Sequence, residues 1–234
     1  MSDDDWRVLG HRPLENVADN LWRVEGDLPG LPLKRVMVVA RMKDGRLVVH
    51  GAMALEESAM KAVEALGEPA VMLVPSGYHR MDAGRFARRY PKMRVYCPAG
   101  ARARVAARVR LDGTYDDFAG DATVRLEPVD GIGDAEGVMR VSSEDGTTLV
   151  LNDILFNMAH PGGLGGVVTW LLGSSGGPRV SRTARIALLK DPRALARRFV
   201  ALAATPALVR VMVAHHETIA DRPADALRDV ALTL

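Results

Sequence analysis

The first half of the chain alternates apolar runs with segments of helical spacing. Apolar runs at 33–42 and 47–50 flank Asp44-Gly45, and this pattern predicts a β-hairpin. Downstream, short apolar runs at 70–74 and 93–96 predict buried strands. Three helices are predicted from helical spacing or from residues that start and stop helices. They lie at 55–66, from about Asp82 to before Pro91, and at 99–109, so that each follows one of the predicted strands. Such alternation is typical of a layered α/β unit, and Asp82 is the expected cap of its helix.

The second half changes to a period of two and then to a glycine-rich stretch. Runs at 123–129, 138–142 and 147–151 predict an antiparallel meander. Seven glycines at 160–178 predict a long loop, 160–180, which could include a mobile turn of helix around Trp170. Asp191-Pro192 predicts the start of a helix that ends near 204, followed by a strand at 208–214 and a helix at 223–230. We expect a single domain over 1–234, with an N-terminal arm at 1–19.

Composition narrows the chemistry more than the fold. The chain has 234 residues, of which 48% are hydrophobic and 26% charged, as in soluble globular proteins. A single cysteine excludes an intramolecular disulfide and multi-cysteine zinc motifs, so the six histidines are the main candidates for metal or acid–base chemistry. An acidic first segment differs from a signal peptide, and no apolar run approaches the ~20 residues of a membrane span. We expect a cytoplasmic protein with no membrane partner.

Three apolar strands end in residues that can bind a metal. The strand at 70–74 leads to His79, the strand at 147–151 to Asp153, and the strand at 208–214 to His215 and His216. Loops past strand ends form the ligand crevice of layered α/β folds, so we expect these side chains to meet. They could bind one divalent metal such as zinc or iron, or they could only hydrogen-bond one another.

The remaining candidates for chemistry are weaker. Cys97 has no assignable base nearby, so we expect a buried and unreactive thiol. His50 ends a strand and is expected to be structural. His160 precedes the glycine-rich stretch and is best explained as a solvated loop residue, although it could reach the crevice as an extra ligand or acid.

The order of these elements resembles the metallo-β-lactamase superfamily, and most of all a divergent branch with no assigned function. The resemblance covers residues 20–220 and implies a four-layer αββα sandwich of two mixed β-sheets. On this alignment His79 matches the last histidine of the His-x-His-x-Asp-His motif, Asp153 the aspartate that bridges two metals, and His215 the final histidine. Four positions at which active members carry ligands hold other residues here: Val74, Ser76, Tyr78 and Ile132.

The resemblance therefore implies a degenerate, at most mononuclear metal site. His79, Asp153 and His215 would hold zinc, iron or manganese, with Asp82 as a possible stand-in for the missing carboxylate. The implied activity is metal-dependent hydrolysis of a small-molecule ester, thioester or phosphoester, in which Asp153, Tyr78 and His216 would assist. The alternative is a catalytically inactive relative without a cofactor that acts as a binding or scaffold protein.

Charge is uneven along the chain although its net value is only +2. Residues 83–111 carry nine bases and no acid, whereas residues 112–153 carry eleven acids against two arginines. Binding of RNA or phosphate through the 83–111 segment is a weaker alternative, because few aromatic residues are interleaved with the bases. A solvated face that pairs with the acidic segment, within one subunit or across a homodimer, explains the pattern more simply. We therefore regard nucleic acid as an unlikely partner.

Overall fold

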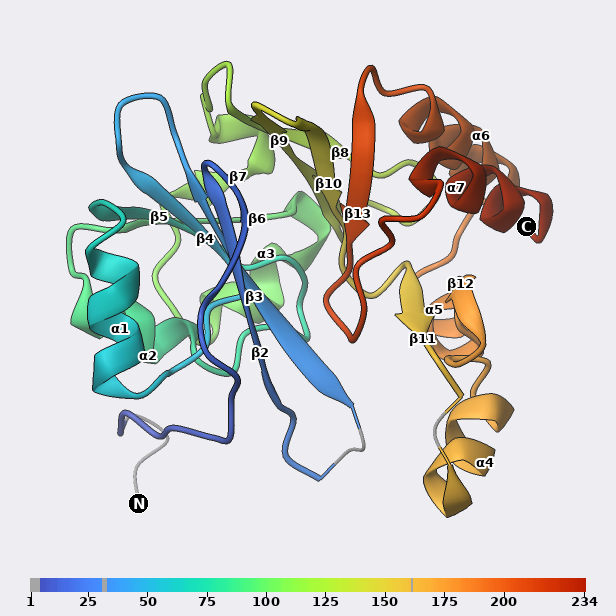
Figure 1. Ribbon diagram of the computed structural model, residues 1–234, viewed down its shortest axis with the longest axis horizontal. Coiled ribbons are helices and arrows are strands. Elements are labelled where there is room, and N and C mark those ends of the chain that lie inside the picture. Colours follow the sequence, from blue (N-terminus) through green and yellow to red (C-terminus); the bar gives the residue numbers. More distant parts are fainter. Residues whose placement is uncertain (1–4, 31–32, 161) are drawn as a thin grey trace.

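The computed structural model describes residues 5–30, 33–160 and 162–234. Its larger sheet has seven strands in sequence order (Figure 1). Neighbours from β1 to β4 are antiparallel, and those from β4 to β7 are parallel. The strands are β1 (Glu15–Ala18), β2 (Leu21–Asp27), β3 (Lys34–Arg41), β4 (Leu47–His50), β5 (Pro69–Leu73), β6 (Arg94–Cys97) and β7 (Gly113–Thr114).

The second sheet has four strands in the order β13-β10-β9-β8. The predicted meander forms β8 (Val124–Pro128), β9 (Gly137–Ser143) and β10 (Gly146–Val150), and β13 (Leu208–Met212) adds to it in parallel with β10. A separate two-stranded ribbon pairs β11 (Phe156–Met158) with β12 (Gly177–Arg179). The mixed strand directions of both larger sheets are those that the resemblance implied.

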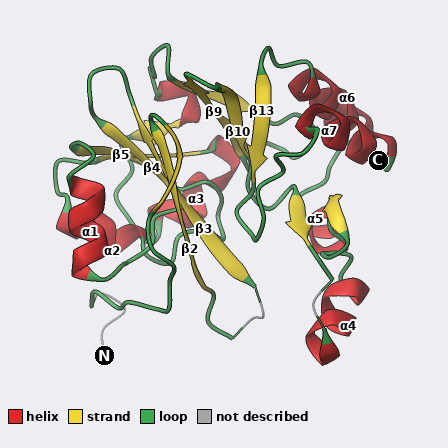
Figure 2. Cartoon of the chain, viewed as in Figure 1, coloured by secondary structure: helices red, strands yellow, loops and turns green. Residues whose placement is uncertain are grey.

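Helices cover the outer face of each sheet (Figure 2). One apolar cluster joins the seven-stranded sheet to its helices, another joins the four-stranded sheet to its own, and a third lies between the two sheets. The molecule therefore has four layers, αββα, as predicted. The helices are α1 (Glu57–Glu64), α2 (Ala83–Arg89), α3 (Arg102–Ala106), α4 (Gly163–Leu171), α5 (Arg182–Ala187), α6 (Pro192–Ala203) and α7 (Pro223–Leu232), with 3₁₀ turns at Ala99–Ala101 and Tyr115–Asp117.

Strand β3 shows why its sequence is apolar without alternation. Val36 and Val38 face the second sheet, whereas Met37 and Val39 face the helices. A strand that is buried on both faces needs apolar side chains at every position. The β3–β4 hairpin is confirmed, and Gly45 accommodates the left-handed φ of +86° that its turn requires.

Two sequence-based boundaries were wrong. The expected loop at 160–180 contains helix α4 and strand β12, because the run from Val167 to Leu172 has no glycine and Gly173, at φ +63°, ends the helix. Helix α4 extends away from the sheets (Figure 1). The expected arm at 1–19 contributes β1 to the larger sheet, and His11 forms a bridge with Gly26. Residues 1–4 and 161 of these two segments lie outside the described part.

The described residues include no helix that is both long enough and apolar enough to cross a bilayer.

Candidate metal centre

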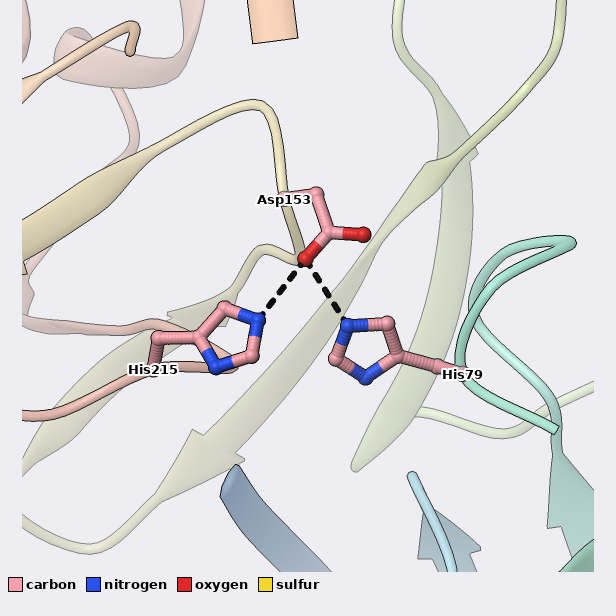
Figure 3. Close-up of side chains that lie close together, drawn as sticks. All are labelled: His79, Asp153 and His215. Carbon is pink, nitrogen blue, oxygen red and sulfur yellow. Dashed lines mark hydrogen bonds and ion pairs between the residues drawn. The ribbon is translucent and has the colours of Figure 1, made fainter. Parts of the chain in front are cut away.

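Parallel pairing of β10 with β13 brings two of the candidate ligands together. Val150 and Met212 are partners at the ends of these strands, and Asp153 and His215 each lie three residues further on. Because parallel strands end at the same sheet edge, equal offsets place the two side chains side by side. His79 comes from the loop after β5 of the other sheet, so the site lies at the junction of both sheets (Figure 3).

The three side chains converge on one carboxylate oxygen. Oδ1 of Asp153 lies 2.8 Å from Nε2 of His79 and 3.0 Å from Nε2 of His215. The two imidazole rings are 5.1 Å apart between centroids. Two imidazole nitrogens and one carboxylate oxygen are donors that zinc, iron and manganese accept in proteins, so this cluster could hold a metal ion.

A backbone contact sets the tautomer of His215. Its Nδ1 lies 2.6 Å from the carbonyl oxygen of Lys34, and because that oxygen can only accept, Nδ1 carries a hydrogen. A neutral His215 then has its lone pair on Nε2, which faces Asp153 Oδ1. Two lone pairs in contact repel, and a proton or a metal ion between the two atoms would remove this repulsion.

Further contacts orient the two histidines. Ser76 is buried, and its Oγ accepts hydrogen bonds from the backbone N–H groups of Tyr78 and His79 at 3.2 and 3.3 Å. This hydroxyl therefore holds the short loop that carries His79. On the other side, Phe156 stacks on the ring of His215 at 5.2 Å and 22°.

Glu136 is a buried residue of this site that the sequence analysis missed. Its Oε1 accepts from the backbone N–H of Asp153 at 3.1 Å and from Nδ2 of Asn152 at 3.2 Å, and its Oε2 accepts from the N–H of Ile154 at 3.0 Å. Only 1% of Glu136 is exposed. The carboxylate thus holds the backbone that carries Asp153, and no periodic feature of the sequence marks it for this role.

Electrostatics distinguish the two neighbouring carboxyl groups. Burial by itself would raise the pKa of Asp153, but the charge of His79 and hydrogen bonds from His215 and His79 hold that pKa well below its usual value. Burial and the nearby charge of Asp153 raise the pKa of Glu136. The structure therefore concentrates negative charge on Asp153, between two imidazoles.

Asp82 does not take part in this cluster. Arg35 and Arg85 donate to its two carboxylate oxygens at 2.6 and 2.5 Å, and the backbone N–H of Ala54 lies 3.3 Å from Oδ2. The expectation that Asp82 could stand in as a ligand is corrected, because both of its oxygens are bound by arginines. Asp82 occupies the N-cap position of α2 as expected, but its side chain makes no capping hydrogen bond.

Tyr78 and His216 lie around the cluster rather than in it. Tyr78 is 56% exposed, and the guanidinium of Arg104 lies 4.7 Å from its ring centroid. His216 has a left-handed φ of +68°, and its Nε2 is buried without a hydrogen-bond partner. Burial and the charge of His215 lower the pKa of His216. Tyr78 therefore lies at the surface beside His79, and His216 is not one of the three residues that converge.

The other candidates have structural surroundings. Ile132 is packed in the core of the second sheet, so the turn that would supply a third histidine contributes an apolar side chain. Cys97 is buried, which raises its pKa to about 11 and keeps the thiol protonated. His160 bonds to Ser175 Oγ at 2.9 Å. His50 is 2% exposed.

A cleft of about 290 Å³ opens onto the cluster, and we call it the metal cleft. Tyr78, His79, Asp153 and His215 form its polar part. Its other walls are mostly apolar, from Leu28, Leu33, Val36, Ala52 and Met81, with the guanidinium of Arg35 among them. A polar end in an otherwise apolar cleft is typical of small-molecule sites.

Comparison with known proteins addresses the fold. No protein-family model and no curated protein matches the chain. A crystal structure of the DIM-1 metallo-β-lactamase exposed to ceftazidime superposes with a TM-score of 0.64 at 12% identity, over 97% of this chain and 99% of that one. The chain has the metallo-β-lactamase fold. A metallo-β-lactamase from Erythrobacter litoralis gives a TM-score of 0.62 at 14% identity, over 94% and 96%, and one from Pontibacter korlensis 0.59 at 10%, over 94% and 99%.

The metallo-β-lactamase fold confirms the predicted architecture. At identities this low the likeness concerns the fold, and activity has to be argued from the site itself.

Proposed function

We propose that the chain binds one divalent metal ion through His79, Asp153 and His215 and hydrolyses a small-molecule ester, thioester or phosphoester. The observation that carries this proposal is the hydrogen bond from His215 Nδ1 to the Lys34 carbonyl. It leaves the His215 Nε2 lone pair directed at a carboxylate oxygen, where a positive charge between the two atoms would be favourable. A bound zinc, iron or manganese ion would supply that charge, acidify a water molecule and polarise the scissile carbonyl or phosphoryl group.

The chain's own residues would share the remaining tasks. Three protein ligands leave at least one position open for water or substrate. The second oxygen of Asp153 points away from both imidazoles (Figure 3), so it can accept a hydrogen bond from a water molecule beside it and orient that molecule. Tyr78, at the mouth of the metal cleft, can orient the substrate through its hydroxyl.

A second metal is not part of the proposal. Val74, Ser76 and Ile132 occupy ligand positions of active superfamily members, and all three are buried. The Ser76 hydroxyl already accepts two backbone hydrogen bonds. The side chains of Val74 and Ile132 have no atom that can bind a metal.

A metal-free binding protein is the second candidate, and one observation favours it. The Nε2–Oδ1 separations of 2.8 and 3.0 Å are hydrogen-bond distances. Ligands of a tetrahedral zinc stand about 3.3 Å apart, because each lies roughly 2.0–2.1 Å from the metal. Binding a metal would therefore require the cluster to open by a few tenths of an ångström, whereas a doubly protonated His215 fits without adjustment.

Metal content separates the two candidates. The full chain would be incubated with zinc, manganese or iron, freed of excess metal and subjected to elemental analysis. We expect about one metal per chain in the wild type and almost none in His215→Asn. His216→Asn is the matched control, because it removes the neighbouring imidazole outside the cluster and asparagine tolerates its left-handed backbone.

The same preparations would be tested on a panel of chromogenic esters, thioesters and phosphoesters. Hydrolysis that requires the metal and is lost in His215→Asn would support the enzyme. A wild type that retains no metal, or equal metal loss in both variants, would contradict the proposed metal site and leave the metal-free candidate.

A further inference from the structure

A second cleft adjoins the metal cleft on the side of α2 and α3. It has a volume of about 420 Å³, and its charged lining consists of Arg80, Arg85 and Arg108; we call it the arginine cleft. Tyr78 and Met81 line both clefts, so a ligand that passes these two side chains can occupy both. The described residues that line the arginine cleft include no acid.

Positive charge is buried between the two clefts. The side chains of Arg35 and Arg85 are each 10% exposed, and both donate to Asp82, which is 1% exposed. Among the described residues, these two guanidinium ions share the single carboxylate of Asp82, so the trio carries one more positive than negative charge. Arg85 faces the arginine cleft and Arg35 the metal cleft. Because a buried charge is costly without a counter-charge, an anion bound beside the trio would be stabilised.

Two of the three guanidinium groups, those of Arg80 and Arg85, are held in position before any ligand arrives. Arg85 donates from Nε to the carbonyl of Asp5 and from Nη1 to Asp82, each at 2.5 Å. Arg80 donates from Nη1 to the carbonyl of Arg104 at 2.8 Å. A guanidinium carries five N–H donors, so these contacts orient each group and use only some of its donors. Such preorganisation lowers the entropy cost of binding.

We propose that the arginine cleft binds the terminal phosphate of a phosphorylated small molecule, whose apolar part and scissile bond lie in the metal cleft. Several planar guanidinium forks suit the three oxygens and nearly two charges of a phosphate monoester, whereas a carboxylate is satisfied by one fork. The phosphate-binding half stands on the arginine cleft alone. The placement of the scissile bond rests on the proposed metal-dependent hydrolysis.

Isothermal titration of inorganic phosphate into the chelator-treated full chain tests the phosphate-binding half without any metal. Arg80→Gln and Arg108→Gln each remove one charged lining residue. We expect each variant to bind phosphate roughly tenfold to a hundredfold more weakly, as for loss of a hydrogen bond to a charged group. Arg110→Gln is the matched control, because it removes the same charge from the same segment and its side chain is 91% exposed. Equal thermal midpoints would show that all variants are folded.

Parallel titrations distinguish the possible sources of the anion. Acetate represents a carboxylate, and a short RNA without a terminal phosphate represents a phosphodiester chain. We expect both to bind more weakly than inorganic phosphate. Equal weakening of phosphate binding in Arg80→Gln and Arg110→Gln would overturn the proposal, because it would indicate only a diffuse positive field. Acetate that binds as well as phosphate, or RNA that binds more tightly, would also overturn it.

The outcome is separable from that of the metal site. His215→Asn should leave phosphate binding within about twofold of wild type, since its imidazole does not line the arginine cleft. If the chain binds phosphate but takes up no metal when zinc, manganese or iron is supplied, the hydrolase is contradicted and the phosphate site remains. A metal-loaded chain that binds no phosphate would contradict the phosphate site and leave the hydrolase.

Discussion

Replacing Glu136 tests whether its carboxylate holds the loop that carries Asp153. In Glu136→Gln one of the two acceptor oxygens becomes an NH₂ group, so at least one backbone N–H of Asp153 or Ile154 loses its partner. A buried donor without a partner costs about 1–3 kcal/mol. We therefore expect the free energy of unfolding to fall by about 1–3 kcal/mol in Glu136→Gln. In Glu136→Ala, where all three hydrogen bonds are lost, we expect a fall of about 3–5 kcal/mol.

Metal affinity supplies a second readout of the same change. Loss of a residue that orients a metal ligand typically lowers metal affinity 10- to 100-fold, and we expect Glu136→Gln to weaken zinc binding within that range. Urea unfolding and zinc titration measure the two effects. Glu144→Gln is the control, because Glu144 is exposed at the turn between β9 and β10 and its replacement should change the unfolding free energy by less than about 0.5 kcal/mol. If Glu136→Gln behaved like Glu144→Gln in both assays, the positioning role would be refuted.

Three further replacements test neighbouring parts of the structure. Asp82→Asn should lower the free energy of unfolding by roughly 3–5 kcal/mol in urea, since it leaves two buried arginines without their carboxylate; a loss of zinc binding as complete as in His215→Asn would instead make it a ligand. Burial and the charge of His79 lower the pKa of His50 from 6.5 to about 3. Between these two pH values the imidazole is protonated in the unfolded chain but not in the folded one. The free energy of unfolding therefore falls by up to about 1.4 kcal/mol per pH unit as the pH drops from 6.5 towards 3. In His50→Leu the free energy of unfolding, measured in urea across that pH range, should depend less steeply on pH. A pH dependence equal to that of the wild type would argue against this effect. Gly131→Ala would place a Cβ 2.4 Å from the carbonyl oxygen of Asp191 at a φ of +85°. It should lower the thermal midpoint more than Gly133→Ala, whose Cβ would lie 3.8 Å from its nearest neighbour, Cγ of Lys190. Equal midpoints would count against the clash.

Most of the fold could be predicted because its signals are local. The Asp44-Gly45 hairpin, the meander and the Asp191-Pro192 helix start each depend on residues that are close in sequence, and the structure has all three. Helix α4 could not be predicted, because the glycines in its first half lower helix propensity. The helical end signal at Gly173 did not outweigh them. Strand β1 was missed because its own sequence has no strand pattern, and it forms through pairing with β2.

The candidate site was predictable where strand ends mark it and not where side chains cross between elements. His79, Asp153 and His215 each follow an apolar run, and a sheet edge brings such positions together. Glu136 accepts from a side-chain amide 16 residues away and from two backbone N–H groups 17 and 18 residues away, and nothing in its local pattern indicates these contacts. Asp82 was predicted as a ligand because it lies three residues after His79. In the structure its carboxylate instead accepts hydrogen bonds from Arg35 and Arg85.

The bonds around the cluster explain why its three residues fit two different states. His215 joins the two halves of the molecule, because its Nδ1 bonds to the Lys34 carbonyl and the adjacent carbonyl of Ala214 accepts from the N–H of Val36 at 2.9 Å. These contacts are made whichever cation lies at Nε2. Metal ligands bind in their deprotonated form, so we expect metal affinity at this site to fall as pH decreases. The same geometry thus suits both proposed states, the metal-bound site and a metal-free cluster joined by hydrogen bonds.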